Sequence, residues 1–218
     1  MPEESSVQEA SYGFHVFISY RRVPKVEEWV WQVFKDELAN WLREWLEGNE
    51  PSIFCDRQDI PAGSKWPLVL ADGLRTSCCL VPVWTPSYFQ SRHCLAELET
   101  FLRREEMVGN LNGRGLIVPV LWHPVPSLHY PRLQRSVRET QSMDFTRFTF
   151  TGNGFRETGR YVEFQEKVRE FARDVAQAVL NTPDFRPDWP LVTPEEIASG
   201  NPPPPPTRIS RLILRKTA

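Results

Sequence analysis

The stretch from Ser91 to Phe101, SRHCLAELETF, places a histidine, a cysteine and a glutamate within five positions. Side chains of these types serve as acids, bases and nucleophiles in enzymes and as metal ligands. Ser91 is also a favourable residue to cap a helix, and the positions after it carry apolar side chains at helical spacing. The stretch is therefore either part of a catalytic site or the first turns of an ordinary helix.

Helical geometry separates the three side chains. His93 and Glu97 are four residues apart and lie on one face of the predicted helix, whereas Cys94 lies on its apolar face. Because adjacent helical residues diverge, His93 and Cys94 cannot form a Cys-His catalytic pair. Cys55, Cys94 and His93 lack the spacing of zinc ligands, so we expect no metal site. Glu97 remains, either as a catalytic carboxylate or as a surface residue favoured near a helix N-terminus.

Five short apolar runs are typical of buried parallel strands and would position this helix. They span residues 14–20, 51–55, 78–84, 115–122 and 141–146. Apolar spacing predicts helices over residues 26–46, in a short stretch up to residue 76, from residue 91 to about 102, and over 161–180, whereas residues 123–140 show no clear period. The alternation of strands and helices predicts an α/β sandwich around a parallel sheet of about five strands.

The chain divides into three parts by composition. Residues 1–12 form a polar leader, residues 13–181 form one domain, and residues 182–218 form a proline-rich C-terminal tail or linker. The polyproline run at residues 202–206 is a stiff, extended spacer. The tail is predicted to be disordered, with a docking element or the stub of a further domain as the alternatives.

Composition limits the classes of partner and the compartment. The chain has 218 residues, 26 Lys and Arg against 28 Asp and Glu, and a net charge of −2, which gives no basic excess to attract nucleic acid. No apolar run is long enough to span a membrane. The leader does not resemble a signal peptide, and the four cysteines form no CxxC pair. We therefore expect a cytoplasmic protein that does not bind nucleic acid directly.

Three segments, in order, resemble the TIR (Toll/interleukin receptor) domain family, NADase type, and are most similar to its bacterial and plant members. HVFISYRR (His15 to Arg22) resembles the family's first strand and the loop after it, and FCDRQDIPAGSKW (Phe54 to Trp66) resembles its BB loop. The segment from Ser91 to Glu97 resembles the pattern Ser-x-Trp-Cys-x-x-Glu, with His93 where tryptophan is usual.

The resemblance implies a flavodoxin-like three-layer sandwich, with a five-stranded parallel sheet in the order 2-1-3-4-5 and helices on both faces. In such sheets ligands bind at the carboxyl ends of the strands. Each of the three segments follows the end of a predicted strand, so we expect them to meet at that edge.

The resemblance also implies chemistry: many TIR domains cleave NAD at its nicotinamide-ribose bond, and the family's catalytic glutamate corresponds to Glu97. NAD is then the substrate, and no cofactor is implied. The implied substrate-binding residues are Tyr20, Arg21, Arg22, Asp56, Ile60, Lys65, Trp66 and His93.

Several of these residues have simpler alternative roles. Arg21 and Arg22 would hold the pyrophosphate or pair with glutamates on the next helix. Asp56 would fix the mouth of the site or cap its loop, and Trp66 would stack on a ligand or anchor a short helix. His93 would cover the nicotinamide or ribose, or lie on the surface of its helix.

Two function classes follow from the resemblance. The first is an NAD glycohydrolase, with ADP-ribose cyclisation as a variant, which acts in immune, antiphage or cell-suicide signalling and requires homo-oligomerisation with other TIR domains. The second is a non-enzymatic scaffold that acts through TIR-TIR contacts and needs no carboxylate at position 97. A nucleoside-transferring enzyme of flavodoxin-like fold would explain the BB-loop segment poorly.

Overall fold

The computed structural model describes residues 11–47, 50–55, 66–109, 113–125 and 131–199. Its centre is a five-stranded parallel sheet with the strand order β2-β1-β3-β4-β5. The strands are β1 (Phe14–Ser19), β2 (Ile53–Phe54), β3 (Ser77–Trp84), β4 (Val120–Leu121) and β5 (Met143–Asp144). The predicted fold class and strand order are therefore confirmed.

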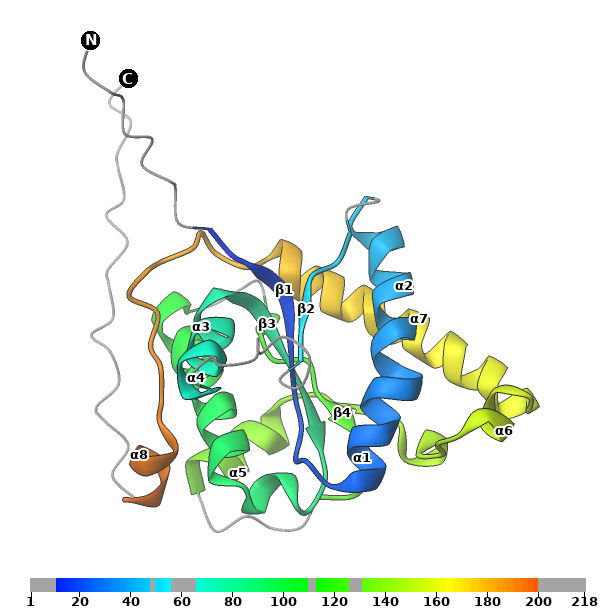
Figure 1. Ribbon diagram of the computed structural model, residues 1–218. Coiled ribbons are helices and arrows are strands. Elements are labelled where there is room, and N and C mark those ends of the chain that lie inside the picture. The colour runs from blue at the N-terminus through cyan, green and yellow to red at the C-terminus, as the bar shows by residue number, and fades with distance from the viewer. Residues whose placement is uncertain (1–10, 48–49, 56–65, 110–112, 126–130, 200–218) are drawn as a thin grey trace, which may run out of the picture.

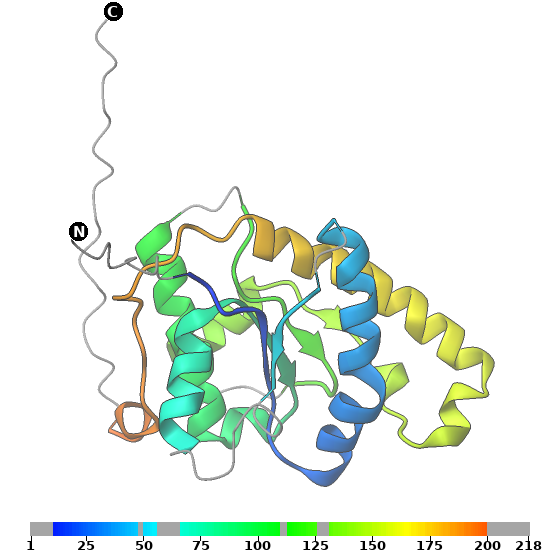
Figure 2. The same cartoon turned by 45° about the horizontal axis from the view of Figure 1, so that its top comes forward.

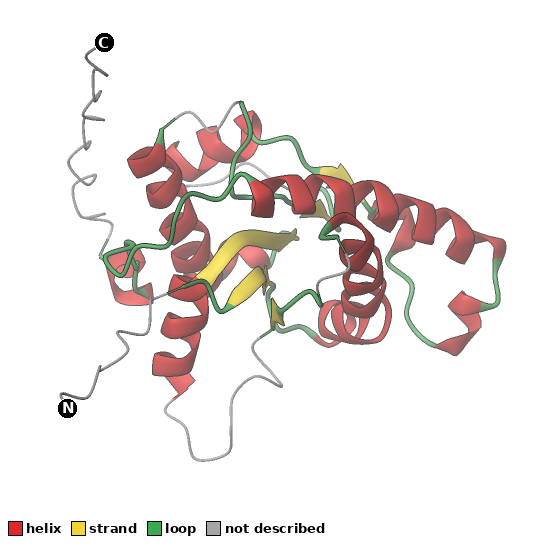
Figure 3. Cartoon of the chain, turned by 90° about the horizontal axis from the view of Figure 1, so that it is seen from above, coloured by secondary structure: helices red, strands yellow, loops and turns green. Residues whose placement is uncertain are grey.

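Helices cover both faces of the sheet and make the three layers visible in Figures 1 and 2. The elements of the first layer are α1 (Pro24–Trp29), η1 (Val30–Phe34), α2 (Lys35–Trp45) and α7 (Gly159–Leu180). Those of the opposite layer are α3 (Trp66–Thr76), α4 (Arg92–Val108) and α5 (Pro131–Glu139). The remaining short helices are η2 (Tyr88–Gln90), η3 (Thr146–Phe148), α6 (Asn153–Arg156) and α8 (Pro194–Ala198). Seen from above in Figure 3, the strands lie between the two helical layers.

Side chains of β1 alternate between two apolar cores. Val16 and Ile18 belong to the core under α1, α2 and α7, whereas Phe17 belongs to the core under α3 and α4. Phe17 stacks on Phe54 of β2 at a ring distance of 4.9 Å. Because both faces of the strand are buried, apolar side chains occupy both of them, at residues 16–18.

An aromatic cluster fixes the first helical layer to the sheet. Trp29 is fully buried, and its ring stacks on Phe34 at 4.7 Å and meets Phe145 and Phe164 edge to face. Its indole Nε1 donates a hydrogen bond of 2.7 Å to the carbonyl of Phe148. Trp29 thereby joins α1 to the segment after β5 and to α7.

Two predicted elements differ from the structure. Residues 131–139 form α5, which the sequence did not indicate because its apolar residues are few, with Leu133 buried and Val137 packed beside it. The predicted strand over 115–122 is paired as β4 only at Val120 and Leu121, with an isolated bridge at Ile117. Pro119 lies between these pairings and has no amide to donate to a ladder.

Residues 182–199 run back across the domain and end in α8 beside α4 (Figure 1). Trp189 and Val192 of this segment are each only 3% exposed. The indole of Trp189 donates to the Tyr12 hydroxyl (3.1 Å), and the Val192 amide donates to Thr100 Oγ1 in α4 (2.9 Å). This part of the predicted tail is therefore packed on the domain, and we call residues 182–199 the strap. The polyproline run, for which the stiff spacer is predicted, lies outside the described residues.

A search of the described helices finds no segment both long and apolar enough to cross a membrane.

Candidate functional site

Glu97 lies at the carboxyl edge of the sheet, in a chain of hydrogen bonds that joins three elements. Ser19, the last residue of β1, donates through Oγ to Glu97 Oε2 at 2.5 Å. The Ser19 hydroxyl also lies 2.9 Å from the hydroxyl of Tyr88 in η2, which donates to the carbonyl of Cys94 at 3.1 Å. Glu97 is only 8% exposed, and both Ser19 and Tyr88 are buried.

The direction of these bonds follows from the number of protons. Burial raises the pKa of Tyr88 well above its usual value, so its phenol remains protonated near neutral pH. When Glu97 is ionised it accepts the single proton of Ser19, and the Ser19 oxygen then accepts from Tyr88. The Tyr88 proton is thus shared between Ser19 and the Cys94 carbonyl. We call the hydrogen-bonded chain of Tyr88, Ser19 and Glu97 the relay. It holds one oxygen of the Glu97 carboxylate in place.

The N-terminus of α4 is formed by Ser91, as predicted. Its Oγ accepts a hydrogen bond from the Cys94 amide at 3.4 Å and caps the helix. The same oxygen lies 3.3 Å from Nη1 of Arg21, which donates to it. Arg21, exposed after the end of β1, is therefore held beside the first turn of the helix that carries Glu97.

A cleft of about 450 Å³ opens between this first turn and α8. His93 is exposed and lies in the wall of the cleft, so His93 and Arg21 share one opening. Glu97 is four residues after His93, about 6 Å farther along the helix axis. The residues that line the cleft are Arg21, Gln90, Ser91, Arg92, His93, Pro194, Glu195 and Ala198.

The other predicted substrate-binding residues are placed differently. Tyr20 is 7% exposed, belongs to the core on the opposite face of the sheet, and accepts a hydrogen bond from the Trp31 indole at 2.9 Å. Arg22 is exposed, and Trp66 is the first residue of α3. Asp56, Ile60 and Lys65 lie outside the described residues.

Cys94 is 3% exposed and belongs to the apolar core beside α4, on a different face from His93. Within the described residues, no group of three or more His, Cys, Asp or Glu side chains is arranged to hold a metal ion.

Ser19 and Tyr88 belong to the relay, but the sequence did not mark either of them as a site residue. One signal was present for Ser19: side chains alternate along a strand, so Ser19 shares a face with Phe17, whereas Tyr20 points to the other face. Tyr88 lies three residues before Ser91, in a stretch whose sequence shows no regular apolar spacing. No local pattern therefore marked it as a site residue.

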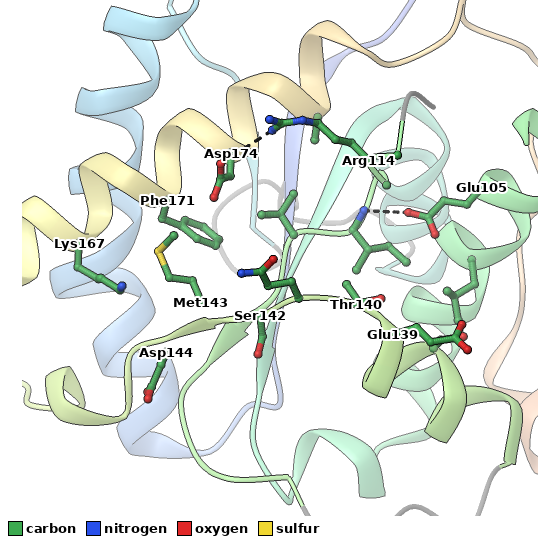
Figure 4. Close-up of a pocket in the computed structure, with 18 residues that line it drawn as sticks. Glu105, Arg114, Glu139, Thr140, Ser142, Met143, Asp144, Lys167, Phe171 and Asp174 are labelled. Atoms are coloured by element: carbon green, nitrogen blue, oxygen red, sulfur yellow. Dashed lines mark hydrogen bonds and ion pairs between the residues drawn. The ribbon is translucent and has the colours of Figure 1, made fainter. Parts of the chain in front are cut away.

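A second, larger hollow of about 940 Å³ lies near the amino ends of β4 and β5 (Figure 4), away from Glu97. The ion pair between Arg114 and Asp174, 3.9 Å apart, crosses one side of it. On another side the partly buried Glu105 accepts hydrogen bonds from the amides of Leu116 (2.5 Å) and Ile117 (3.2 Å). Glu105 therefore holds the segment that leads into β4.

Glu105 is expected to make stability depend on pH. Its burial, opposed by the two amides, raises its pKa from 4.5 to about 7. Between these values the unfolded chain loses a proton that the folded protein keeps, so the free energy of unfolding falls as pH rises. Between pH 4.5 and 7 this effect should lower the free energy of unfolding of the wild type by on the order of 2–3 kcal/mol. We expect Glu105→Gln to abolish this decrease. Urea unfolding across this pH range measures the slope.

Glu163→Gln, an exposed change of the same kind on α7, is the control and should leave the slope as in the wild type. If Glu105→Gln and the wild type show the same slope, the raised pKa of Glu105 is wrong.

Among solved structures, this chain is similar to the TIR domain of the Toll-related receptor TRR-2 from Hydra magnipapillata, with 17% sequence identity and a TM-score of 0.41. The match covers 72% of this chain and 98% of that chain. The TIR domains of the activated Roq1 resistosome, which recognises the pathogen effector XopQ, are 21% identical, with a TM-score of 0.36 and 73% and 83% covered. No curated protein matches significantly. The family model described as "TIR domain" matches residues 16–158, most of the folded chain, and this protein therefore belongs to the TIR domain family.

Proposed function

We propose that this protein is an NAD glycohydrolase whose catalytic carboxylate is Glu97. One observation carries the proposal: the Glu97 carboxylate is held by Ser19 at the carboxyl edge of the sheet, one helical turn behind a cleft lined by Arg21 and His93. This edge is where ligands bind in sheets with this strand order.

The reaction requires little more than one oriented negative charge. The C1′–N1 bond of NAD breaks, its electron pair goes to the pyridine nitrogen, and nicotinamide leaves as a neutral molecule. Water then adds to C1′ and releases a proton, which gives ADP-ribose. Because the leaving group needs no protonation, a single carboxylate suffices, in contrast with the two of an ordinary glycoside hydrolase. Glu97 would bind the ribose hydroxyls and stabilise the positive charge that develops on the ribose.

Other residues of the cleft would position the substrate. The guanidinium of Arg21 suits phosphate oxygens and is already oriented by Ser91. The exposed His93 ring would cover the ribose or nicotinamide, where the family pattern has tryptophan. No cofactor is required, and the cyclisation of ADP-ribose would use the same carboxylate.

Self-association is part of the proposal. The family resemblance supports a site that a second copy of the domain completes. Because Glu97 is only 8% exposed in the single chain, assembly would also have to open the carboxylate to the substrate. In this reading the protein acts in the cytoplasm, in immune, antiphage or cell-suicide signalling, where assembly starts the loss of NAD.

A scaffold without hydrolase activity is the second candidate. It is favoured by the hydrogen bond and near burial of Glu97, which a structural glutamate at a helix packed on a sheet would also show. In that case TIR-TIR contacts alone would transmit the signal.

Nicotinamide release distinguishes the two candidates. Purified protein is mixed with NAD over a range of protein concentrations, with and without a crowding agent, and nicotinamide and ADP-ribose are separated by chromatography. We expect the rate per molecule to rise with concentration, because assembly completes the site. An absence of release at the highest concentration, with assembly verified by light scattering, would establish the scaffold instead.

A further inference from the structure

The strap is fixed on α4, the helix that carries Glu97. Thr100 lies three residues after Glu97, and its Oγ1 accepts the Val192 amide while donating to the Ala96 carbonyl at 2.8 Å. The buried Trp189 holds the strap to Tyr12, whose hydroxyl also donates to the Pro183 carbonyl at 3.1 Å. These contacts pack the strap against the domain beside α4.

The end of the strap reaches the mouth of the site. Thr193 caps α8 and forms a capping box with Glu196, which fixes the direction of this short helix. Glu195, which precedes Glu196 in the first turn of α8, is exposed and lines the same cleft as Arg21 and Arg92. A carboxylate from the strap therefore shares the 450 Å³ cleft with two guanidinium groups.

The cleft brings together the guanidinium groups of Arg21 and Arg92 and the carboxylate of Glu195, and Glu97 follows His93 of its wall by one helical turn. NAD carries a diphosphate, which suits guanidinium groups, between two riboses with free hydroxyls, which suit carboxylates. A carboxylate accepts hydrogen bonds from the 2′-hydroxyl of an adenosine ribose and repels a phosphate on the same oxygen.

We infer that Glu195 is a specificity-determining residue, which binds the adenosine ribose of NAD and excludes NADP. The inference rests on the proposed function and adds the strap to the substrate site. It places the discriminating carboxylate outside the segment that the family model matches, which ends at residue 158.

The test measures kcat/KM for NAD and for NADP with the wild type, Glu195→Gln and the control Glu163→Gln, at one protein concentration. The wild type should favour NAD by about tenfold or more, and Glu195→Gln should reduce that ratio at least about fivefold, mainly through faster NADP cleavage. Glu163→Gln, with the same charge change at an exposed position of α7, should keep the wild-type ratio. An unchanged ratio in Glu195→Gln, or equal changes for both substrates, overturns the inference.

A binding measurement separates this inference from the proposed hydrolysis. Calorimetry compares the affinities of ADP-ribose and ADP-ribose 2′-phosphate for the wild type and Glu195→Gln, without any reaction. If NAD is not cleaved but Glu195→Gln selectively tightens the 2′-phosphate ligand, the site assignment holds and the hydrolase proposal fails. If neither ligand binds, both proposals fail.

Discussion

Replacing Glu97 by glutamine is expected to lower kcat for nicotinamide release by about a hundred- to a thousandfold, the range observed when one group that stabilises transition-state charge is removed. Glutamine has nearly the same volume and can still accept the hydrogen bond from Ser19. It lacks the negative charge that would stabilise the ribose cation. KM should change less than kcat, because the charge acts mainly on the transition state. Steady-state assays at a concentration where the wild type is assembled measure both constants.

Glu99→Gln is the matched control for this experiment. Glu99 is also a buried glutamate of α4, but its carboxylate pairs with Arg103 at 3.2 Å. Its replacement should lower stability and leave kcat near the wild-type value when measured below the unfolding transition. Equal nicotinamide release from wild type and Glu97→Gln would remove Glu97 from the catalytic role.

The largest effect on stability is expected from Trp29→Ala, with a loss of about 3–5 kcal/mol of unfolding free energy. The change removes a fully buried ring from the cluster with Phe34, Phe145 and Phe164 and leaves a cavity. It also leaves the carbonyl of Phe148 without the indole donor. A domain of this size has only about 5–15 kcal/mol of stability, so this loss would remove a large share of the total free energy of unfolding. Urea denaturation followed by circular dichroism measures the loss.

Trp45→Ala provides the comparison, because Trp45 is at the end of α2 and is 41% exposed. Its replacement should cost about 1 kcal/mol or less. A similar loss in both variants would show that the cluster around Trp29 has no special part in holding α1 to the sheet.

Local patterns in the sequence predicted the α/β class and most of its elements, and the resemblance to TIR domains supplied the strand order. Apolar runs such as residues 14–20 and 78–84 are buried on both faces, and helical spacing marks α2, α4 and α7. The helix that begins at Ser91 was predicted from the capping residue and the apolar stripe. Where the local pattern was weak, as in the polar α5, the sequence did not indicate the helix.

The surroundings of Glu97 depend on contacts between residues far apart in the chain. Ser19 and Glu97 are separated by 78 positions and Ser19 and Tyr88 by 69, so no local period relates them. Only the parallel pairing of β1 with β3 brings their ends to one edge of the sheet.

The strap shows the same division between sequence and tertiary structure. Its proline-rich composition favoured a tail outside the domain, since composition reports on a segment in isolation. The fold instead provides Tyr12 and Thr100 as partners for Trp189 and Val192, and burial of these two side chains offsets the entropy lost on ordering the segment. The sequence by itself thus determined most of the elements and, through the family resemblance, singled out Glu97, whereas tertiary packing decided which side chains surround Glu97 and which segment lies beside its helix.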